Sequence, residues 1–425
     1  MLETLKKSLA ALGADGWELT ENKTRRWEFY FIRHALDQNR AADTVNYNVK
    51  VYKKLEGGLL GSASCEINPT DTASEVEKKL ADLLSRASLV KNPAYSLVSE
   101  KITLPDKTER VDVQKIARDF IEAVASVPET ETEDINSYEI FVSEITRHTL
   151  NSNGVEYTAI YPASMLEIVV NARREGHEIE LYRQFNSGSC DKEKVRADVL
   201  AAMRTGRDRL AAEPTPRVEN IDVVLSTEDA VNVFEYFTMN ANVQAKYRRI
   251  SPFEQGKPVC DWQGGDKITV RAVRELDNSS RNFPVDAEGS VIEERDIIKD
   301  GVLCNFWGQR QFSQYLGIEK NSVISNFVFD GGSMGADELR SGDYIELVEF
   351  SDFQVDSMGG DVAGEIRLGY LHKDCETKII TGGSVSGSMI EAAPTMKYSR
   401  ETAQYNNIVI PAVVRLKNLR ITGVK

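Results

Sequence analysis

The first half of the chain repeats one order of hydrophobic and polar patterns. A β-like run begins at Trp27 with Trp-Glu-Phe-Tyr-Phe-Ile-Arg, and a similar run begins at Tyr138 with Tyr-Glu-Ile-Phe-Val-Ser-Glu. In each copy, β-like runs are followed by a helical pattern in which apolar residues recur every three or four positions. We therefore expect two copies of one strand, strand and helix unit, over about residues 20–100 and 130–212. The β-like runs are Trp27–Arg33, Val45–Tyr52, Tyr138–Glu144, Met165–Asn171 and Glu178–Phe185.

The helical patterns also carry signals that mark where each helix begins. Thr72 and Glu75 have the spacing of a capping box ahead of the first helix. Asp112 and Asp191 are suited to cap the two helices that follow. The apolar faces are Val76, Leu80, Leu83, Leu84 and Ala87 in the first helix, Val113, Ile116, Phe120, Ile121 and Val124 in the second, and Val195, Val199, Leu200, Met203 and Leu210 in the third.

A proline-containing segment separates the two halves of the chain. Pro214 and Pro216 lie in the run Ala211–Arg217, where no helix can continue. We therefore predict an α+β fold with an N-terminal domain over residues 1–215 and a β-rich C-terminal domain over residues 216–425. The C-terminal domain should be a twisted antiparallel, barrel-like body with short helices. Its β-like runs are Lys267–Arg274, Val291–Lys299, Tyr344–Phe350, Gly364–Tyr370, Thr377–Thr381 and Ile408–Leu416, and its helical runs are Gln309–Leu316 and Ala336–Arg340.

Composition and charge narrow the functional classes. The chain of 425 residues has a formal net charge of -14, which argues against nucleic-acid binding because that requires clustered Lys and Arg. No apolar run reaches the roughly 18 residues of a membrane span, and the N-terminus has an amphipathic helical pattern instead of a signal peptide. The five cysteines are widely spaced and form no CxxC pair. These features predict a reduced, cytoplasmic protein with no nucleic-acid or membrane partner.

A helical pattern between Thr227 and Asn240 carries one glutamate, Glu235, among apolar residues. The strand-like run Ile221–Leu225 precedes it. These surroundings resemble the TldD/PmbA family, whose members are named in older usage as modulators of DNA gyrase. The resemblance extends over most of residues 221–425, and it depends on the order and spacing of several segments. These segments are Phe283–Gly289, Asp300–Leu303, Gln311–Gly317, Ser333–Leu339 and Thr381–Gly387.

The resemblance implies that this chain has lost a metal site. Active members of the family carry His-Glu-x-x-x-His in this helix, and the two histidines hold a catalytic metal together with a cysteine near the C-terminus. The matching positions here are Phe234, Glu235 and Met239, and Ala403 aligns with the cysteine. Phenylalanine and alanine have no donor atom, and a thioether prefers soft ions to zinc. We therefore expect no metal, no cofactor and no catalytic residue, as in the metal-free PmbA (TldE) type of member.

The resemblance also implies partners. The chain is expected to be a bacterial subunit, involved in proteolysis or peptide processing, that pairs with a TldD-like metallopeptidase subunit as a heterodimer. Self-association as a homodimer is the other arrangement. A peptide substrate would bind by adding a strand to a sheet edge. The alternative function is a stand-alone, homodimeric peptide-binding or scaffold protein without catalytic activity.

An enzyme without a metal is a further alternative. Gly331–Gly335 matches Gly-x-Ser-x-Gly, which would make Ser333 the nucleophile and His372 its base. The C-terminal half lacks the alternation of strands and helices that such enzymes require, so a turn residue is the simpler interpretation of Ser333. Glu235 is the other candidate, although its place on an amphipathic helix favours a side chain that faces solvent. The four histidines include no pair at zinc-binding spacing.

Overall fold

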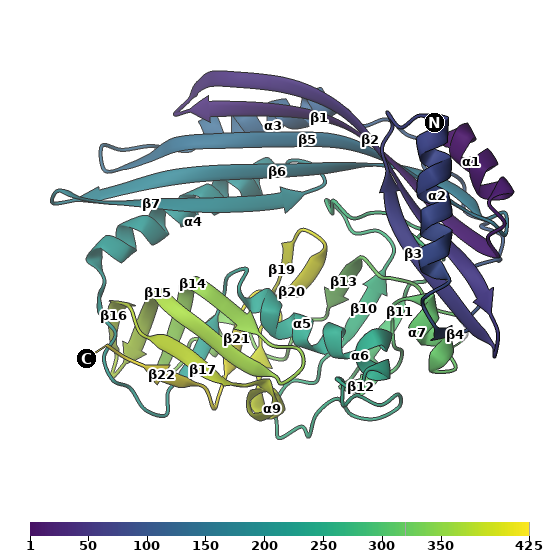
Figure 1. Cartoon of the computed structure of the whole chain (residues 1–425). Helices are drawn as coiled ribbons and strands as arrows, with labels where there is room; N and C mark the ends of the chain where they lie inside the picture. Colours follow the sequence, from purple (N-terminus) through teal and green to yellow (C-terminus); the bar gives the residue numbers. More distant parts are fainter. Residues whose placement is uncertain (319, 425) are drawn as a thin grey trace.

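In the computed structural model, which describes residues 1–318 and 320–424, the N-terminal half forms an antiparallel sheet of seven strands (Figure 1). The order across the sheet is β4-β3-β2-β1-β5-β6-β7. The strands of the two expected copies meet at the centre, where β1 pairs with β5 and Trp27 lies opposite Val142. The strands are β1 (Gly16–Ile32), β2 (Ala35–Leu55), β3 (Leu59–Ile67), β4 (Asn92–Pro93), β5 (Glu133–Asn151), β6 (Glu156–Arg174) and β7 (His177–Ser187).

The central strands are much longer than the hydrophobic pattern predicted. β1 and β2 together run from Gly16 to Leu55, whereas the expected runs were Trp27–Arg33 and Val45–Tyr52. Almost all residues from 35 to 44 are exposed, so the alternation that identifies a half-buried strand is missing there. Backbone pairing with β1 keeps this segment in the sheet without burial of its side chains.

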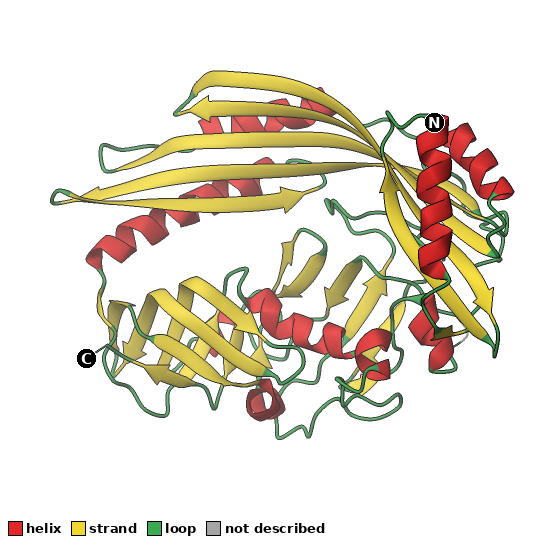
Figure 2. Cartoon of the chain, in the orientation of Figure 1, coloured by secondary structure: helices red, strands yellow, loops and turns green. Residues whose placement is uncertain are grey.

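Helices cover one face of this sheet. Leu19 lies in the core beneath α1 and α2, and Phe31 lies in the core beneath α3 and α4. Because alternate residues of a strand face the same side, both cores are on the same face of β1. Figure 2 shows α3 and α4 running behind the long strands. The helices are α1 (Leu2–Ala11), α2 (Ala73–Ala87), α3 (Val113–Ala125) and α4 (Lys192–Ala211), and the expected caps Thr72, Asp112 and Asp191 accept their hydrogen bonds.

The C-terminal half contains two further sheets that share one large hydrophobic core with the helix α5. The first has the order β12-β11-β10-β13-β20-β19, and the second runs β18-β21-β9-β14-β15-β16-β8, with β17 and β22 attached through β15. The strands of the first sheet are β10 (Val270–Val273), β11 (Arg295–Lys299), β12 (Val302–Leu303), β13 (Asn326–Phe329), β19 (Thr402–Tyr405) and β20 (Ile408–Pro411). Those of the second are β8 (Glu213–Pro214), β9 (Asp222–Leu225), β14 (Tyr344–Val355), β15 (Asp361–Lys373), β16 (Glu376–Thr381), β17 (Ser384–Ser388), β18 (Lys397–Tyr398), β21 (Val414–Leu416) and β22 (Arg420–Thr422). The helices are α5 (Ala230–Asn240), α6 (Val243–Tyr247), α7 (Arg310–Tyr315), α8 (Ala336–Leu339) and α9 (Met389–Ala392).

The α+β class predicted from the sequence is confirmed, with two differences in the C-terminal half. Three strand pairs are parallel, namely β9 with β14, β13 with β20, and β8 with β16. Both sheets are also open in the described residues, so the expected barrel-like closure is not seen there. The helices predicted at Gln309–Leu316 and Ala336–Arg340 are present as α7 and α8. None of the described helices combines the length and the apolar character needed to span a membrane.

The two halves touch at both ends of the molecule. At one end, Tyr370 on β15 donates a hydrogen bond to Asp208 on α4 at 2.6 Å. At the other end, the hydroxyl of Tyr315 on α7 donates to the carbonyl of Pro93 at 2.6 Å.

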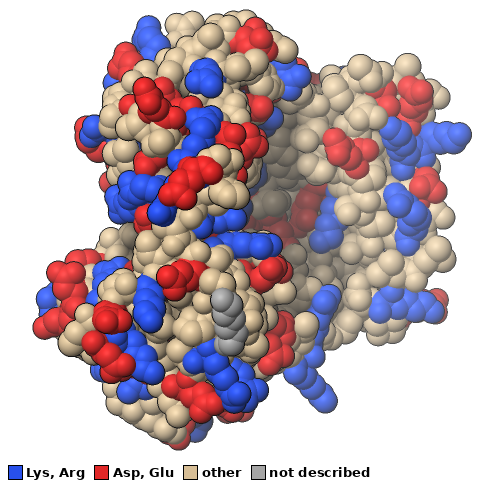
Figure 3. Space-filling view, turned by 90° about the vertical axis from the view of Figure 1, so that its left-hand side faces the viewer, with Lys and Arg blue, Asp and Glu red and all other residues tan. Residues whose placement is uncertain are grey.

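Further contacts join the halves between these two points. The Gly188 N–H donates to the carbonyl oxygen of Asn278 at 2.7 Å, and the rings of Tyr161 and Phe283 pack at 5.4 Å between centroids. Figure 3 shows a hollow in the surface, with basic and acidic side chains mixed along its rim.

Candidate functional site

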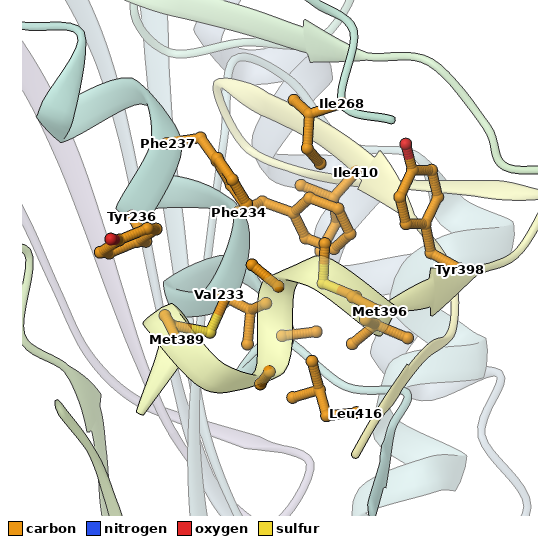
Figure 4. Packing of buried hydrophobic residues seen from close by; sticks show 14 of the residues in the cluster. Val233, Phe234, Tyr236, Phe237, Ile268, Met389, Met396, Tyr398, Ile410 and Leu416 are labelled. Atoms are coloured by element: carbon orange, nitrogen blue, oxygen red, sulfur yellow. The ribbon is translucent and has the colours of Figure 1, made fainter. Parts of the chain in front are cut away.

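The helix α5 begins a few residues after the buried strand β9, and it carries the residues that align with the family's metal motif. Phe234 is completely buried, and its ring packs edge-on against Phe329 at 5.2 Å and against Tyr398 at 5.7 Å between ring centroids. Figure 4 shows this ring between α5 and the strands of the C-terminal half. Edge-to-face contacts of this kind stabilise a core beyond the burial of their area. The position of the first histidine is therefore hydrophobic core.

The other two positions of the motif point away from this core. Glu235 is exposed, and Met239 is 44% exposed. Five residues along an α-helix correspond to a rotation of about 140° from the starting direction, so Phe234 and Met239 lie on different faces of α5. The expectation that Glu235 faces solvent is confirmed. Burial by neighbouring protein raises the pKa of its carboxyl, which Arg281 opposes.

Ala403 lies on β19, opposite Ile410 of β20. Strand β20 contacts α5, so Ala403 is one strand away from the helix. Its methyl group has no donor atom for a metal. Among the described residues, no group of three or more His, Cys, Asp or Glu side chains is arranged to hold an ion. A buried ring, an exposed thioether and a methyl group do not fit the metal of active members, which needs nitrogen and sulfur donors that converge.

Ser333 does not form a nucleophile elbow. Its hydroxyl donates to Asp266 Oδ1 at 2.8 Å, and His372 lies elsewhere, stacked on Tyr344 and hydrogen-bonded to Thr377 at 2.9 Å. Although burial opposes it, hydrogen bonds from Tyr398, Ser333 and Lys397 hold the pKa of Asp266 below its usual value. Asp266 is therefore a carboxylate fixed by three hydrogen bonds, and His372, the expected base, does not contact the serine.

The glycines of the same motif have a packing role. A Cβ atom at Gly331 would lie 2.2 Å from the carbonyl oxygen of Arg400, and one at Gly332 would lie 2.1 Å from that of Tyr398. Only glycine allows two backbones to approach so closely. Gly331, the first glycine of the motif, and its neighbour Gly332 are thus needed for close packing against residues 398–400, and their presence does not require a nucleophile elbow.

A cavity of about 300 Å³ lies between the two halves, close to the start of α5. The N-terminal half contributes the end of β7 and the beginning of α4, and the C-terminal half contributes Glu228 and the end of β19. Strands β7 and β19 are both outer strands of their sheets. Outer strands present unpaired backbone groups that an added strand can bind. The cavity is therefore bordered by two sheet edges.

Charged groups in and beside this cavity are mostly carboxylates. Burial raises the pKa of Asp198 and of Glu228, and it raises the pKa of Asp229, just before α5, to about 6. Lys194 pairs with Asp198 at 3.0 Å and lies 5.6 Å from the ring centroid of Tyr405. No functional signal marks these residues in the sequence, because they come from separate segments with no common spacing.

Comparisons with known proteins agree on one family and one fold. Residues 218–423 match the family model described as the PmbA/TldA metallopeptidase C-terminal domain. Comparison with curated protein sequences gives no match. The fold is similar to that of TldE from Thermococcus kodakarensis, with a TM-score of 0.78 and 15% identity over 99% of this chain and 100% of that chain.

Two crystal structures described as candidate modulators of DNA gyrase are also similar. The protein from Thermotoga maritima has a TM-score of 0.78 and 15% identity, over 99% of this chain and 100% of that chain. The protein from Bacteroides thetaiotaomicron has a TM-score of 0.80 and 17% identity, over 100% of this chain and 98% of that chain. At these identities the similarity demonstrates a common fold over the whole chain.

Proposed function

Because this chain belongs to the TldD/PmbA family, we propose that it acts in proteolysis or peptide processing as the metal-free subunit of a metallopeptidase pair. The partner is a TldD-like chain that holds the metal and cleaves the peptide. This chain contributes shape, stability and a surface for peptide, and it carries out no hydrolysis.

The packing of Phe234 carries this proposal. Active members need a metal ligand at this position, and here a completely buried ring packs against Phe329 and Tyr398. The ring supplies no ligand, and protein interiors leave no room beside such a ring for an ion and its bound water. A chain with a buried phenylalanine at this position therefore depends on a metal-bearing partner for hydrolysis.

The cavity between β7 and β19 supports a role in holding peptide. Both strands are outer strands, and both line the cavity. An extended peptide can join such an edge through main-chain hydrogen bonds, which do not depend on its sequence. Peptide would then be held next to α5, where a partner's metal site could reach it.

Metal analysis of the chain, alone and in complex, tests the proposal. The chain is produced with added zinc, by itself and together with a chain that bears His-Glu-x-x-x-His, and metal content and peptide cleavage are measured. We expect no stoichiometric metal in this chain alone, and cleavage that chelators abolish only in the complex. Stoichiometric zinc, or chelator-sensitive cleavage, in this chain alone would contradict the proposal.

A homodimeric peptide-binding scaffold is the second candidate, and one observation favours it. Both β7 and β19 are outer strands of their sheets. An outer strand can receive a strand from a second copy of the chain as well as from a peptide. Light scattering and peptide titration of the chain alone distinguish the candidates, since a scaffold gives a stable dimer that binds peptide without cleavage when no second protein is added.

A further inference from the structure

A second cavity, of about 330 Å³, lies where the segment before α3 meets the C-terminal half near α7. Among the described residues, four basic side chains and two acidic ones line it. The basic residues are Lys101, Arg295, Arg310 and Lys320, and the acidic residues are Glu100 and Glu293. We call this cavity the basic pocket. Its volume is at the lower end of the range for small-molecule sites, and its lining has an excess of positive charge.

Arg310 forms part of the wall of the basic pocket. Its Nε donates to the carbonyl oxygen of Ser96 at 2.8 Å, and its guanidinium pairs with Glu100 at 3.2 Å. These contacts also hold the segment before α3 against α7. The charge of Arg310 is thus balanced within the protein, and so is the charge of Glu100.

The charge of Arg295, at the start of β11, is not balanced in this way. Its guanidinium donates to the side-chain oxygen of Asn321 and to the carbonyl oxygen of Phe306, which are both neutral. In the described part of the chain, its hydrogen-bond partners include no carboxylate, and its Nε is buried without a hydrogen-bond partner. Burial lowers the pKa of this arginine, which Glu293 opposes. A buried guanidinium stays charged, so it favours a nearby negative group.

Ser290 provides a second donor without a partner in the same lining. Only 7% of this residue is exposed, and its hydroxyl makes no hydrogen bond to the described residues. Its backbone N–H is already bound to Asp286 Oδ1 at 2.9 Å, so the turn that holds it is fixed. An unpaired buried hydroxyl costs about 1–3 kcal/mol. A ligand oxygen that accepts from both Ser290 and Arg295 would remove both costs.

From the unpaired donors of Arg295 and Ser290 and the excess of basic side chains, we propose that the basic pocket binds a small oxyanion, either a carboxylate or a phosphate. Arg295 donates to the oxyanion from within the pocket, and Ser290 rotates its hydroxyl towards it. Lys101 and Lys320, which are exposed, add positive charge at the rim. The pocket is separate from α5 and from the cavity beside β7, so this site does not depend on the function proposed above.

Calorimetric titration of the full chain tests the proposal with three probes. Inorganic phosphate represents a phosphate ligand, N-acetylglycine represents a carboxylate, and N-acetylglycine amide is the neutral control. We expect one of the two anions to bind more tightly than about 1 mM and the amide not to bind. Binding should weaken as salt is added, because part of the attraction comes from exposed charges.

Two substitutions locate the binding. Arg295→Gln should weaken it about tenfold or more, the loss expected for one charge-assisted hydrogen bond. Lys101→Gln removes an exposed charge without disturbing the core, and it should weaken binding by a smaller factor. Arg271→Gln is the control, because Arg271 is an exposed residue of β10 that pairs with Asp330 and does not line the pocket.

Three results would overturn the proposal. They are the absence of binding by both anions, equal binding of the amide, and affinities that neither Arg295→Gln nor Lys101→Gln changes. If Arg295→Gln fails to fold, Lys101→Gln decides the question by itself.

Discussion

The core around α5 and the contacts between the two halves have opposite chemistry. Around α5, the position expected for a metal ligand is filled by Phe234, which packs against other aromatic rings. Between the halves, carboxylates such as Glu18 and Asp286 are buried with raised pKa values, and the half-buried Arg295 has no anionic partner among the described residues. The core around α5 has an aromatic ring at the position expected for a metal ligand. The contacts between the halves, in contrast, place ionisable groups in the protein interior.

This difference separates positions that maintain the fold from positions that can bind. The residues of a hydrophobic core are explained by stability alone, because close packing stabilises each of them. Burial of an ionisable group costs free energy that packing does not offset. The presence of such groups therefore needs an explanation other than stability. In this chain, the cavities between the halves are therefore better candidates for binding than the helix that aligns with the metal motif.

The largest effect is expected from the removal of the Phe234 ring. Phe234→Ala should lower the free energy of unfolding by about 3–5 kcal/mol, because it leaves a cavity in a core that cannot collapse around it. Met239→Ala is the matched control on the same helix, and since Met239 is largely exposed it should change stability by less than about 0.5 kcal/mol. Denaturant unfolding of both variants measures the difference. Similar losses would show that α5 is not divided into a core face and a solvent face.

The next effect concerns Glu18 and pH. Glu18 on β1 is buried, and burial is the main reason that its pKa rises to about 7. Lys50 and a hydrogen bond from Tyr52 oppose this shift, whereas Glu288 and Asp286 increase it. At a pH between the pKa of Glu18 in the unfolded chain and its pKa in the folded chain, the Glu18 carboxyl takes up a proton when the chain folds. The stability that Glu18 contributes is therefore complete below about pH 4.5 and is lost as the pH rises through 7.

Glu18→Gln should remove this dependence on pH. Glutamine resembles the protonated acid, so the variant should be more stable than the parent chain at pH 8, by roughly 3 kcal/mol from the size of the shift. The two chains should differ little at pH 4.5. Glu56→Gln, at an exposed turn, should keep the pH profile of the parent chain. A Glu18→Gln profile parallel to that of the parent chain would mean that Glu18 is ionised in the folded protein at neutral pH.

The same contrast decides what could be predicted from the sequence. The helices were located correctly because their apolar residues recur with helical spacing, as Val76, Leu80 and Leu83 do on α2. The residues at the positions aligned with the metal motif were also readable, since Phe234 and Met239 lie in a single short segment. That these positions hold no metal stays a prediction. The outer part of β2 was missed because its side chains are exposed, and pairing with β1 leaves no hydrophobic pattern.

The sites between the halves were not predictable in this way. Glu18 is buried near Asp286, and Ser290 and Arg295 share a cavity with Lys101. Asp286, Ser290 and Arg295 come from one segment, whereas Glu18 and Lys101 come from distant segments of the other half. No spacing relates the two groups, and only the folded sheets bring them together.

A smaller effect is expected at Ser333. Ser333→Ala removes the hydrogen bond to Asp266, which should cost about 1 kcal/mol because Asp266 keeps its bonds to Lys397 and to the Tyr398 amide. Ser351→Ala is the control, since Ser351 makes a similar bond to Glu365 at an exposed position and should contribute almost nothing. Thermal unfolding of both variants measures the two costs. A loss of peptide cleavage by Ser333→Ala at unchanged stability would return Ser333 to the candidates for a nucleophile.

The smallest effect is expected at Glu235, and it tests whether α5 has kept any chemistry. Glu235 is exposed, and neither Phe234 nor Met239 offers a ligand that suits a zinc-bound water beside it, so we expect its raised pKa alone to give it no reaction to catalyse. Glu235→Gln should change the free energy of unfolding by less than about 0.5 kcal/mol. It should also leave peptide cleavage by the complex with a metal-bearing partner unchanged, together with its pH profile. The matching substitution in the partner's His-Glu-x-x-x-His should abolish that cleavage. If Glu235→Gln slows cleavage or shifts its pH profile, this carboxylate takes part in the reaction, and α5 then belongs with the binding regions of the molecule.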